Sequence, residues 1–446
     1  MLSGLENIPK IPELKRRLWW TVVLLAVYRL GVHVPTPGIN GPELERYFQS
    51  QEANVFGLFN LFTGGALERF SVFALGIMPY ISASIILQLL TVVVPTLERL
   101  SKEGEAGRRK INQYTRYATV PLSMVQAFGI SAWIESIQGE SGLGSVVLNP
   151  GLSFKLLTMV TLCSGTVFLM WLGEQITERG IGNGISLVIY AGIVARLPQA
   201  LGNMMSLMET KELPLFGVVL LIGFMAVVVG LIVHFERAHR RVPVHYAKRV
   251  VGRRMYGAQA TYLPLKLNVT GVIPPIFASS LLMFPVTMLQ FIPKEFVADH
   301  PSLEWFVDGM NGQGLVYNVA YVVFILFFAY FYAAIQFDPD KVADDMRRYG
   351  GYIPGIRPGK KTAEYLNRIL GRLTLVGGLY LSAICVLPSV LYGYFHMPFG
   401  FGGTSLLIVV GVGMDTLAQV ETHLITRSYD GFLSGAGGGG RFRGRR

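Results

Sequence analysis

The sequence predicts an all-α membrane protein that crosses the bilayer ten times. Of its 446 residues, 51% are apolar and only 15% are charged, whereas soluble domains carry about 25% charged residues. The charges are gathered between long uncharged runs, and an apolar run of about 20 residues is typical of a membrane-spanning helix. This composition excludes an ordinary soluble domain and a disordered chain. Two cysteines are too few for a disulfide-rich secreted protein.

Ten apolar runs are predicted to be spans. They are 18–34, 72–94, 117–137, 152–173, 184–204, 214–235, 269–292, 315–336, 373–395 and 404–425. The first run follows the basic cluster Lys15, Arg16 and Arg17, and no small-residue cleavage site comes after it, so we expect a retained helix. The fifth run is the least regular, because Arg196 and Pro198 interrupt it.

The spans divide into two sets of five. We expect a cytoplasmic N-terminal segment (1–17), an N-terminal half (18–204), a C-terminal half (214–425) with cytoplasmic loops at 236–268 and 337–372, and a flexible basic tail (426–446). The long basic loop 236–268 is our candidate for the hinge between the halves. An odd number of spans in each half permits an inverted repeat, although no internal repeat is visible in the sequence.

The basic residues predict the orientation. All but seven of the 39 Lys and Arg residues lie in the N-terminal segment, in the loops after spans 2, 4, 6 and 8, or in the tail. Basic loops stay in the cytoplasm. Both termini are therefore predicted to be cytoplasmic, in agreement with an even number of spans.

The segment between the first two spans fits neither a span nor a polar loop. It is apolar, but Gly64-Gly65 and Glu68-Arg69 make it too short and too broken to cross. Such a stretch can lie at membrane depth only where protein or a wet cavity surrounds it. From composition alone, an amphipathic surface helix is the favoured alternative.

Five ionisable residues fall within the spans, where a charge is costly and usually functional. They are Arg29, Glu174, Arg196, Asp415 and Glu421. Four lie toward span ends, where snorkelling or helix capping would suffice. Asp415 is deeper, and we expect its carboxylate to accept a hydrogen bond from a neighbouring helix rather than to act in a proton relay.

No catalytic, cofactor or metal motif survives inspection. Residues 355–361 fail the phosphate-loop pattern at both ends, and the glycine-rich run 180–184 follows a charged turn rather than a strand. His234, His239 and His245 have no carboxylate or cysteine at zinc spacing. Loop 236–268 is basic with interleaved tyrosines, which suits RNA phosphates, acidic proteins or anionic lipid. It also suits a loop held inside by its charge alone.

Seven longer runs carry a resemblance. They are FALGIMPYISAS at 73–84, GRRK at 107–110, QYTRY at 113–117, WLGEQITERGIGNG at 171–184, GVIPPIFASS at 271–280, PGIRPG at 354–359 and FGGTSLLIVV at 401–410. The chain resembles the SecY family, the central subunits of the bacterial protein-conducting Sec channel. The Gly/Arg-rich tail lies outside this resemblance.

The resemblance implies a clamshell of two inverted five-helix halves around an hourglass pore, with a re-entrant plug helix at 57–70 that overrides the surface-helix alternative. The implied plug residues are Leu58, Phe59, Asn60, Leu61, Phe62, Thr63, Gly64, Gly65, Ala66, Leu67, Glu68, Arg69 and Phe70. The implied pore ring is Ile77, Ile81, Ile185, Ile189, Ile276 and Ile408. A lateral gate is implied between spans 2 and 7, with Gln88 and Asn268 as its polar pair and Ser82 nearby.

The function implied is that of a non-enzymatic channel without cofactors in the bacterial cytoplasmic membrane. It would translocate unfolded secretory polypeptides with signal sequences and release transmembrane segments sideways into the phospholipid bilayer. The implied partners are the membrane subunits SecE and SecG, with SecA or the ribosome as the source of energy. Arg253, Arg254 and Arg357 are the expected docking contacts for SecA or the ribosome.

Two other classes are weighed against this one. An inverted-repeat secondary transporter of a small solute requires a compact polar site at the membrane midplane, where this chain offers mainly isoleucines. A polytopic membrane enzyme requires a convergent His/Asp/Glu or metal constellation.

Overall fold

A computed structural model describes most of the chain. The described residues are 11–50, 60, 63–137, 146–210, 214–246, 249–251, 254–256, 260–289, 305–307, 309–310, 314–395 and 403–436. Ten helices within this part coincide with the ten predicted spans. They are α2 (Pro12–Gly31), α5 (Met78–Val93), α7 (Glu105–Ile137), α8 (Leu152–Arg179), α9 (Gly184–Ala195), α11 (Leu215–Arg237), α12 (Ile273–Leu289), α15 (Leu315–Gln336), α17 (Lys360–Phe395) and α18 (Gly403–Ala436).

Length and composition agree with a multi-pass membrane protein. Within the described residues, six helical segments are long and apolar enough to cross a membrane, and α5 with α6 (Pro95–Lys102), bent by 99°, makes a seventh. Pro95 explains the bend, because a proline leaves the preceding residue extended, and Val94 is extended. Helix α18 continues to Ala436, so the first part of the predicted flexible tail is helical.

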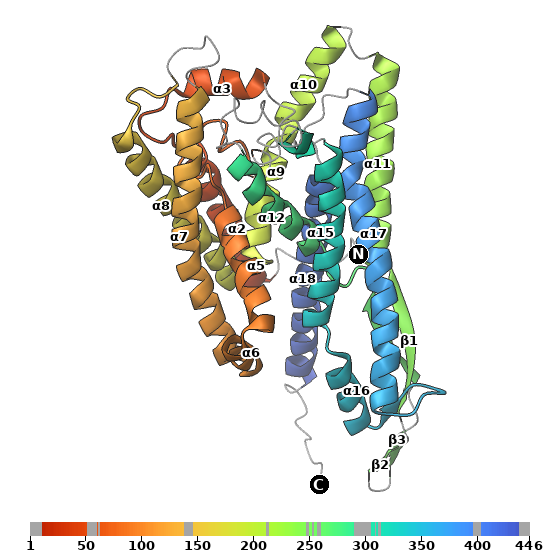
Figure 1. The fold of residues 1–446 in the computed structure, drawn as a ribbon. Coiled ribbons are helices and arrows are strands. Elements are labelled where there is room, and N and C mark those ends of the chain that lie inside the picture. Colours follow the sequence, from red (N-terminus) through yellow and green to blue (C-terminus); the bar gives the residue numbers. More distant parts are fainter. Residues whose placement is uncertain are drawn as a thin grey trace, which may run out of the picture.

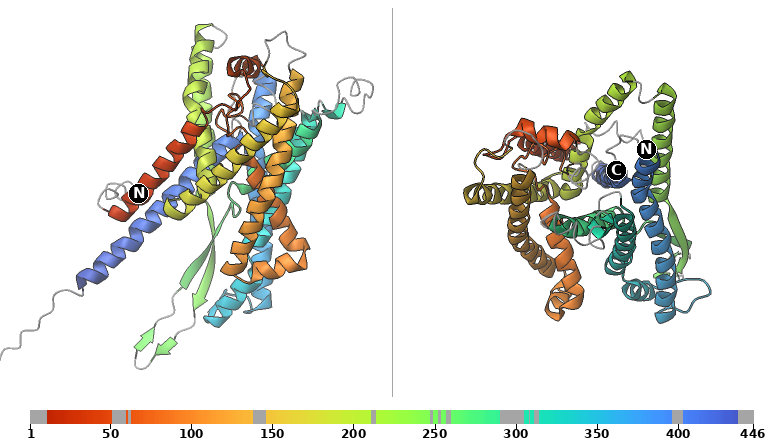
Figure 2. Two further views of the ribbon diagram at one scale, coloured as in Figure 1. Left: turned by 90° about the vertical axis from the view of Figure 1, so that its left-hand side faces the viewer. Right: turned by 45° about the horizontal axis from the view of Figure 1, so that its top comes forward.

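The ten helices form two groups that stand side by side (Figure 1). Helices α2, α5, α7, α8 and α9 pack on one another, as do α11, α12, α15, α17 and α18. The two groups meet where α5 packs on α12 and where α9 packs on α18. In the tilted view, α5, α12, α9 and α18 lie around the middle of the molecule (Figure 2). The predicted arrangement of two five-helix halves is confirmed.

The connection between the halves differs from the prediction. Helix α9 ends at Ala195, and α10 (Leu197–Glu209) begins with a proline in its first turn, a position where the missing N–H breaks no helical hydrogen bond. The chain then passes to the second half from α10 to α11 (Figure 1). Loop 236–268 lies between α11 and α12 inside the C-terminal half, so placing the hinge there was wrong.

The two large loops of the C-terminal half form one small domain, here called the basal platform. Its sheet has the order β4-β1-β5, formed by β1 (His239–Tyr246), β4 (Ala260–Lys266) and β5 (Gly351–Tyr352). Both pairings are antiparallel, with Val242 opposite Leu263 and His245 opposite Tyr352. Helix α16 (Pro339–Arg348) and the start of α17 complete it, and β2 (Arg249–Val251) pairs with β3 (Arg254–Tyr256) at its tip.

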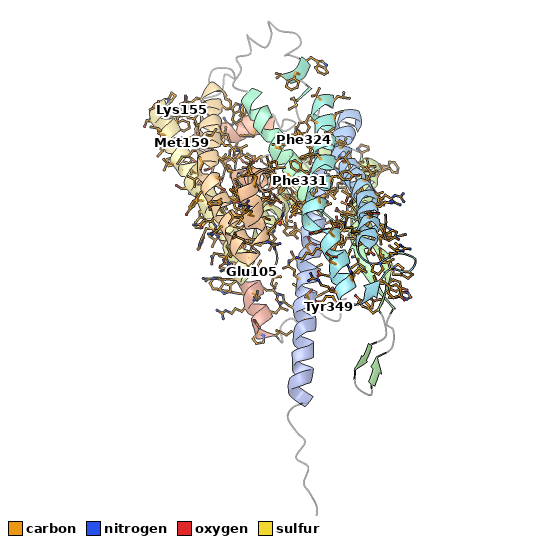
Figure 3. All side chains as sticks on the ribbon, turned by 60° about the horizontal axis from the view of Figure 1, so that its bottom comes forward. Glu105, Lys155, Met159, Phe324, Phe331 and Tyr349 are labelled. Carbon is orange, nitrogen blue, oxygen red and sulfur yellow. The ribbon has the colours of Figure 1, made fainter. Side chains whose placement is uncertain are left out.

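The basic loops of both halves lie at one end of the molecule. Figure 3 shows Glu105, at the start of α7, and Tyr349, after α16, at this end, with Lys155 and Met159 of α8 toward the opposite end. The remaining described helix, α3 (Gly41–Ser50), lies at that opposite end (Figure 1). This arrangement agrees with the prediction that the basic loops, which follow even-numbered spans, lie on one side of the membrane.

Candidate functional site

The six isoleucines of the implied pore ring sit near the starts of four helices. Ile77 caps α5 and Ile81 lies one turn into it. Ile185 and Ile189 lie on α9, Ile276 in the first turn of α12, and Ile408 on α18. Each half therefore contributes two helices, and these are the same helices that pack across the boundary between the halves.

None of these isoleucines is exposed at the lipid-facing surface. Five of them are at most 6% exposed, and Ile185 is half-buried. The five belong to the main apolar cluster, and Ile185 packs against it. From spacing alone, these isoleucines could have faced lipid or packed in a core, and their burial agrees with packing inside the helical bundle.

The described part of the plug segment is buried except for Arg69, and three of its residues, Ala66, Leu67 and Phe70, belong to the same cluster. Leu67 and Phe70 are fully buried and belong to it, so the alternative of an amphipathic surface helix is wrong for these residues. Asn60 is helical, but 63–70 forms consecutive turns rather than the expected helix. Gly64 and Gly65 have φ of +68° and +86°, a left-handed conformation that ends helices and that glycine adopts readily. Leu58, Phe59, Leu61 and Phe62 lie outside the described residues.

A largely buried ion pair holds the plug. Arg196, at the break between α9 and α10, places Nη2 3.0 Å from Oε2 of Glu68, and their side chains are only 19% and 8% exposed. Asn60 Nδ2 donates to the same carboxylate oxygen over 3.0 Å, and Asn60 Oδ1 accepts from the Glu68 amide. Glu68 is therefore the centre of a network that links the plug to the end of α9.

Helix α2 also binds the plug, through two hydrogen bonds. Tyr28 Oη donates to the carbonyl of Thr63 over 3.1 Å, and Arg29 Nη1 donates to the carbonyl of Gly64 over 2.9 Å. Gly64 also lies against Gly192 of α9, where an added Cβ would come within 2.7 Å of the Gly192 Cα. All these contacts come from the N-terminal half. We define the plug clamp as Tyr28, Arg29, Asn60, Glu68 and Arg196.

The sequence did not predict these roles for the intramembrane charges. Arg29 and Arg196 bind the plug rather than snorkelling, and Glu174 pairs with Arg116 at 2.7 Å. Asp415 is exposed on α18 rather than hydrogen-bonded to a neighbouring helix. Glu68 and Arg196 are 128 residues apart, and the only signal was that each interrupts an apolar run.

Of the implied gate residues, Ser82 and Gln88 lie on α5, and Asn268 lies shortly before α12. These helices touch, since Ser280 Oγ lies 3.4 Å from Met78 Sδ. Gln88 Nε2 donates to Ser84 on its own helix, whereas Asn268 Nδ2 donates to Glu236 over 2.6 Å. A hydrogen bond between Gln88 and Asn268 is absent from this described region, so the implied polar pair is not formed here. Ser82 is half-buried on α5.

The implied docking residues lie in or near the basal platform. Arg357 is exposed in the turn between β5 and α17, and its carbonyl accepts a hydrogen bond from Thr362 Oγ1 over 3.0 Å. Arg254 lies in β3, and Arg253 falls outside the described residues. Buried Val242 and Val244 alternate with exposed residues along β1, and this pattern could have identified the strand from the sequence.

Comparisons with known proteins agree with this architecture. The SecY family model matches residues 71–417. The chain is 47% identical to the protein translocase subunit SecY of Escherichia coli K12, over 95% of both chains. Two solved structures share its fold. One is of a SecY protein whose plug domain stabilises the closed translocation channel and maintains a membrane seal (TM-score 0.64, 19% identity, 94% of this chain and 96% of that chain). The other is of Sec61 in a canine ribosome-channel complex (TM-score 0.58, 18% identity, 94% and 96%).

The fold and the site define a class: a multi-pass membrane channel subunit made of two five-helix halves. The six isoleucines come from both halves and lie in or against the main apolar cluster. The chain belongs to the SecY family. The transporter alternative is not supported.

Proposed function

We propose that this chain is a passive protein-conducting channel for unfolded polypeptides. The observation that carries the proposal is the set of six isoleucines, five buried and one half-buried, shared between the two halves, with the plug packed into the same apolar cluster. A narrow apolar constriction loses water and so opposes ions. It also has no charge or hydrogen-bonding group with which to hold a passing chain of arbitrary sequence.

The plug supplies the second part of the seal. The polar contacts of the plug clamp are all made within the N-terminal half, whereas the isoleucines come from both halves. Separation of the halves would therefore widen the constriction without breaking the plug clamp. Release of the plug is a separate step, in which Glu68 leaves Arg196.

The boundary between α5 and α12 is the proposed lateral gate, through which apolar segments pass into lipid. Its side-chain contacts are weak: the hydrogen bonds measured between membrane helices average about 0.6 kcal/mol. An intercalating signal sequence could replace them with apolar contacts.

The energy for translocation and the remaining subunits of the complex are expected to come from partner proteins. We propose that the channel itself is not an enzyme, that SecA or the ribosome drives it, and that SecE and SecG complete the complex. The family resemblance supports these partners, as does the ribosome-bound structural neighbour. Basic loops that gather at one end support a cytoplasmic location for that end and for both termini, in the bacterial inner membrane.

The proposed function is tested by export into proteoliposomes. The chain is purified with SecE and SecG, reconstituted, and supplied with SecA, ATP and a secretory precursor. Protection of the precursor from external protease measures translocation. A precursor that becomes protected only when the chain is present supports the proposal, and equal protection in vesicles without it contradicts it.

Reversal of the charge at Arg357 is expected to slow SecA-driven export several-fold without affecting assembly. Arg357 is exposed on the basal platform, and like charges facing each other across an interface are unfavourable. The measurement is the initial rate of precursor protection for R357E. The matched control is R46E in α3, at the opposite end of the molecule. Equal rates for R357E and wild type would contradict the docking assignment.

A further inference from the structure

The short segment 267–271, which leads from β4 into α12, is bound entirely within the C-terminal half. Asn268 is only 3% exposed. Its Nδ2 donates to Glu236 Oε1 over 2.6 Å and to the Gly271 carbonyl over 3.1 Å. Its Oδ1 accepts from Thr270 Oγ1 over 3.2 Å. The whole amide of Asn268 is therefore engaged on its own side of the gate.

Two helices hold this lead-in segment. Glu236 lies in the last turn of α11, and the Leu267 amide donates to the Ala238 carbonyl just after that helix over 2.8 Å. From the other side, Gly377 of α17 comes so close that an added Cβ would lie 3.1 Å from the Leu267 carbonyl oxygen. The stacked rings of Phe235 and Tyr380, 4.3 Å apart, join α11 to α17 next to this point.

The other side of the gate makes no matching contact. Gln88 Nε2 is used within α5, and Gln88 Oε1 is buried without a hydrogen-bond partner in the described chain. A buried amide oxygen without a partner is unfavourable. Gln88 therefore contributes nothing to holding Asn268 in this state, whereas the carboxylate of Glu236 makes a short, charge-assisted hydrogen bond to it.

The last residue of the anchored segment, Gly271, is the candidate pivot for α12. Gly271 has φ of +62°, and among the described residues no heavy atom beyond its chain neighbours lies within 4 Å of the place where its Cβ would be. Helix α12 begins two residues later and carries Ile276 in its first turn and Ser280 at the contact with α5. Rotation at Gly271 would move both and would release the Gly271 carbonyl from Asn268 Nδ2, while Asn268 Nδ2 keeps its hydrogen bond to Glu236.

We propose that Glu236 is a positioning residue of the lateral gate: its carboxylate anchors Asn268, so that α12 opens by turning about Gly271. This inference rests on the proposed gate between α5 and α12. The strength of the anchor then sets how well α12 is held against α5, and thus how apolar a segment must be to open the boundary.

The test measures closure of the gate directly. M78C and S280C are introduced together into a chain whose Cys163 and Cys385 are replaced by alanine, and the yield of the disulfide across α5 and α12 is measured in resting membranes. E236A is expected to lower the ratio of crosslinked to non-crosslinked chain about tenfold, because a hydrogen bond to a charged group is lost. Export of a precursor with a defective signal sequence is expected to rise in parallel. The control is E178A, which removes an exposed glutamate from the last turn of α8.

Double mutants identify the partner of Asn268. N268A combined with E236A should lower the disulfide yield no further than either change alone, whereas N268A and Q88A should act independently. N268D places two carboxylates together and should resemble E236A, and E236Q added to N268D restores a donor and an acceptor and should recover the yield. If the E236A protein fails to accumulate, the N268D and E236Q pair provides the test instead. Coupling of Asn268 to Gln88 instead of Glu236, or no recovery in the exchange, would overturn the proposal.

Failure of the gate itself would look different. If the disulfide between M78C and S280C forms and yet leaves the insertion of transmembrane segments unaffected, the boundary between α5 and α12 is not the exit, and the proposed gate is wrong. If that disulfide blocks insertion but E236A leaves its yield unchanged, the gate stands and the role of Glu236 is wrong.

Discussion

Channels that carry E68A are expected to leak ions when they are reconstituted into vesicles. The substitution leaves Arg196 largely buried without its anion and also removes the acceptor of Asn60 Nδ2. Removing one partner of a buried ion pair costs about 3–5 kcal/mol, enough to shift the plug toward released states. Efflux of a trapped anion from proteoliposomes measures the leak, and we expect it to rise at least several-fold over wild type.

Exchanging the two charges tests whether the ion pair itself holds the plug. E68R combined with R196E restores opposite charges between the plug and the α9–α10 break, and we expect it to reduce the leak seen with either change alone. The matched control is E98A, which breaks a solvent-exposed pair with Lys102, a kind of pair that contributes little to stability. Vesicles with E68A that are as tight as wild type would show that the plug clamp does not seal the channel.

An asparagine in place of Ile276 is expected to have the second large effect. Ile276 is 6% exposed in the main apolar cluster, and an amide there would retain water in the proposed apolar constriction. We expect I276N to leak ions and to export precursors with weakened signal sequences. Ion efflux and the export rate of such a precursor are the two measurements, and I81N on α5 should behave in the same way.

The control for this series places the same amide on a lipid-facing surface. Ile222 on α11 is 52% exposed, so I222N introduces the same polar group outside the constriction. We expect vesicles with equal amounts of I222N to remain tight. If I81N and I276N are both as tight as I222N, these isoleucines do not line the conducting path.

Periodicity and charge predicted the helical frame because they are local properties of the chain. Each span was visible as an apolar run, and Arg196 and Pro198 marked the break that separates α9 from α10. The strands of the basal platform were not predicted. Their alternation is confined to pairs such as Val242 and Val244, within a loop dominated by basic residues.

The candidate site could be predicted only in part, because it depends on contacts between distant residues. The isoleucines came from family resemblance, since four-residue spacing alone does not distinguish a pore face from a lipid face. The pairing of Glu68 with Arg196 and of Asn268 with Glu236 is a property of packing. Nothing in the order of these residues along the chain specifies which polar group meets which.

The central claim is that a polypeptide in transit passes the buried isoleucines. The most direct test stalls a secretory precursor carrying a single cysteine within the channel and measures its disulfide formation with a cysteine at Ile81, Ile276 or Ile408, in turn, each in a chain without Cys163 and Cys385. We predict adducts at all three positions and none with a cysteine at the lipid-facing Ile222. Adducts at none of the three positions, from a precursor shown to span the membrane, would contradict a shared conducting path through these residues.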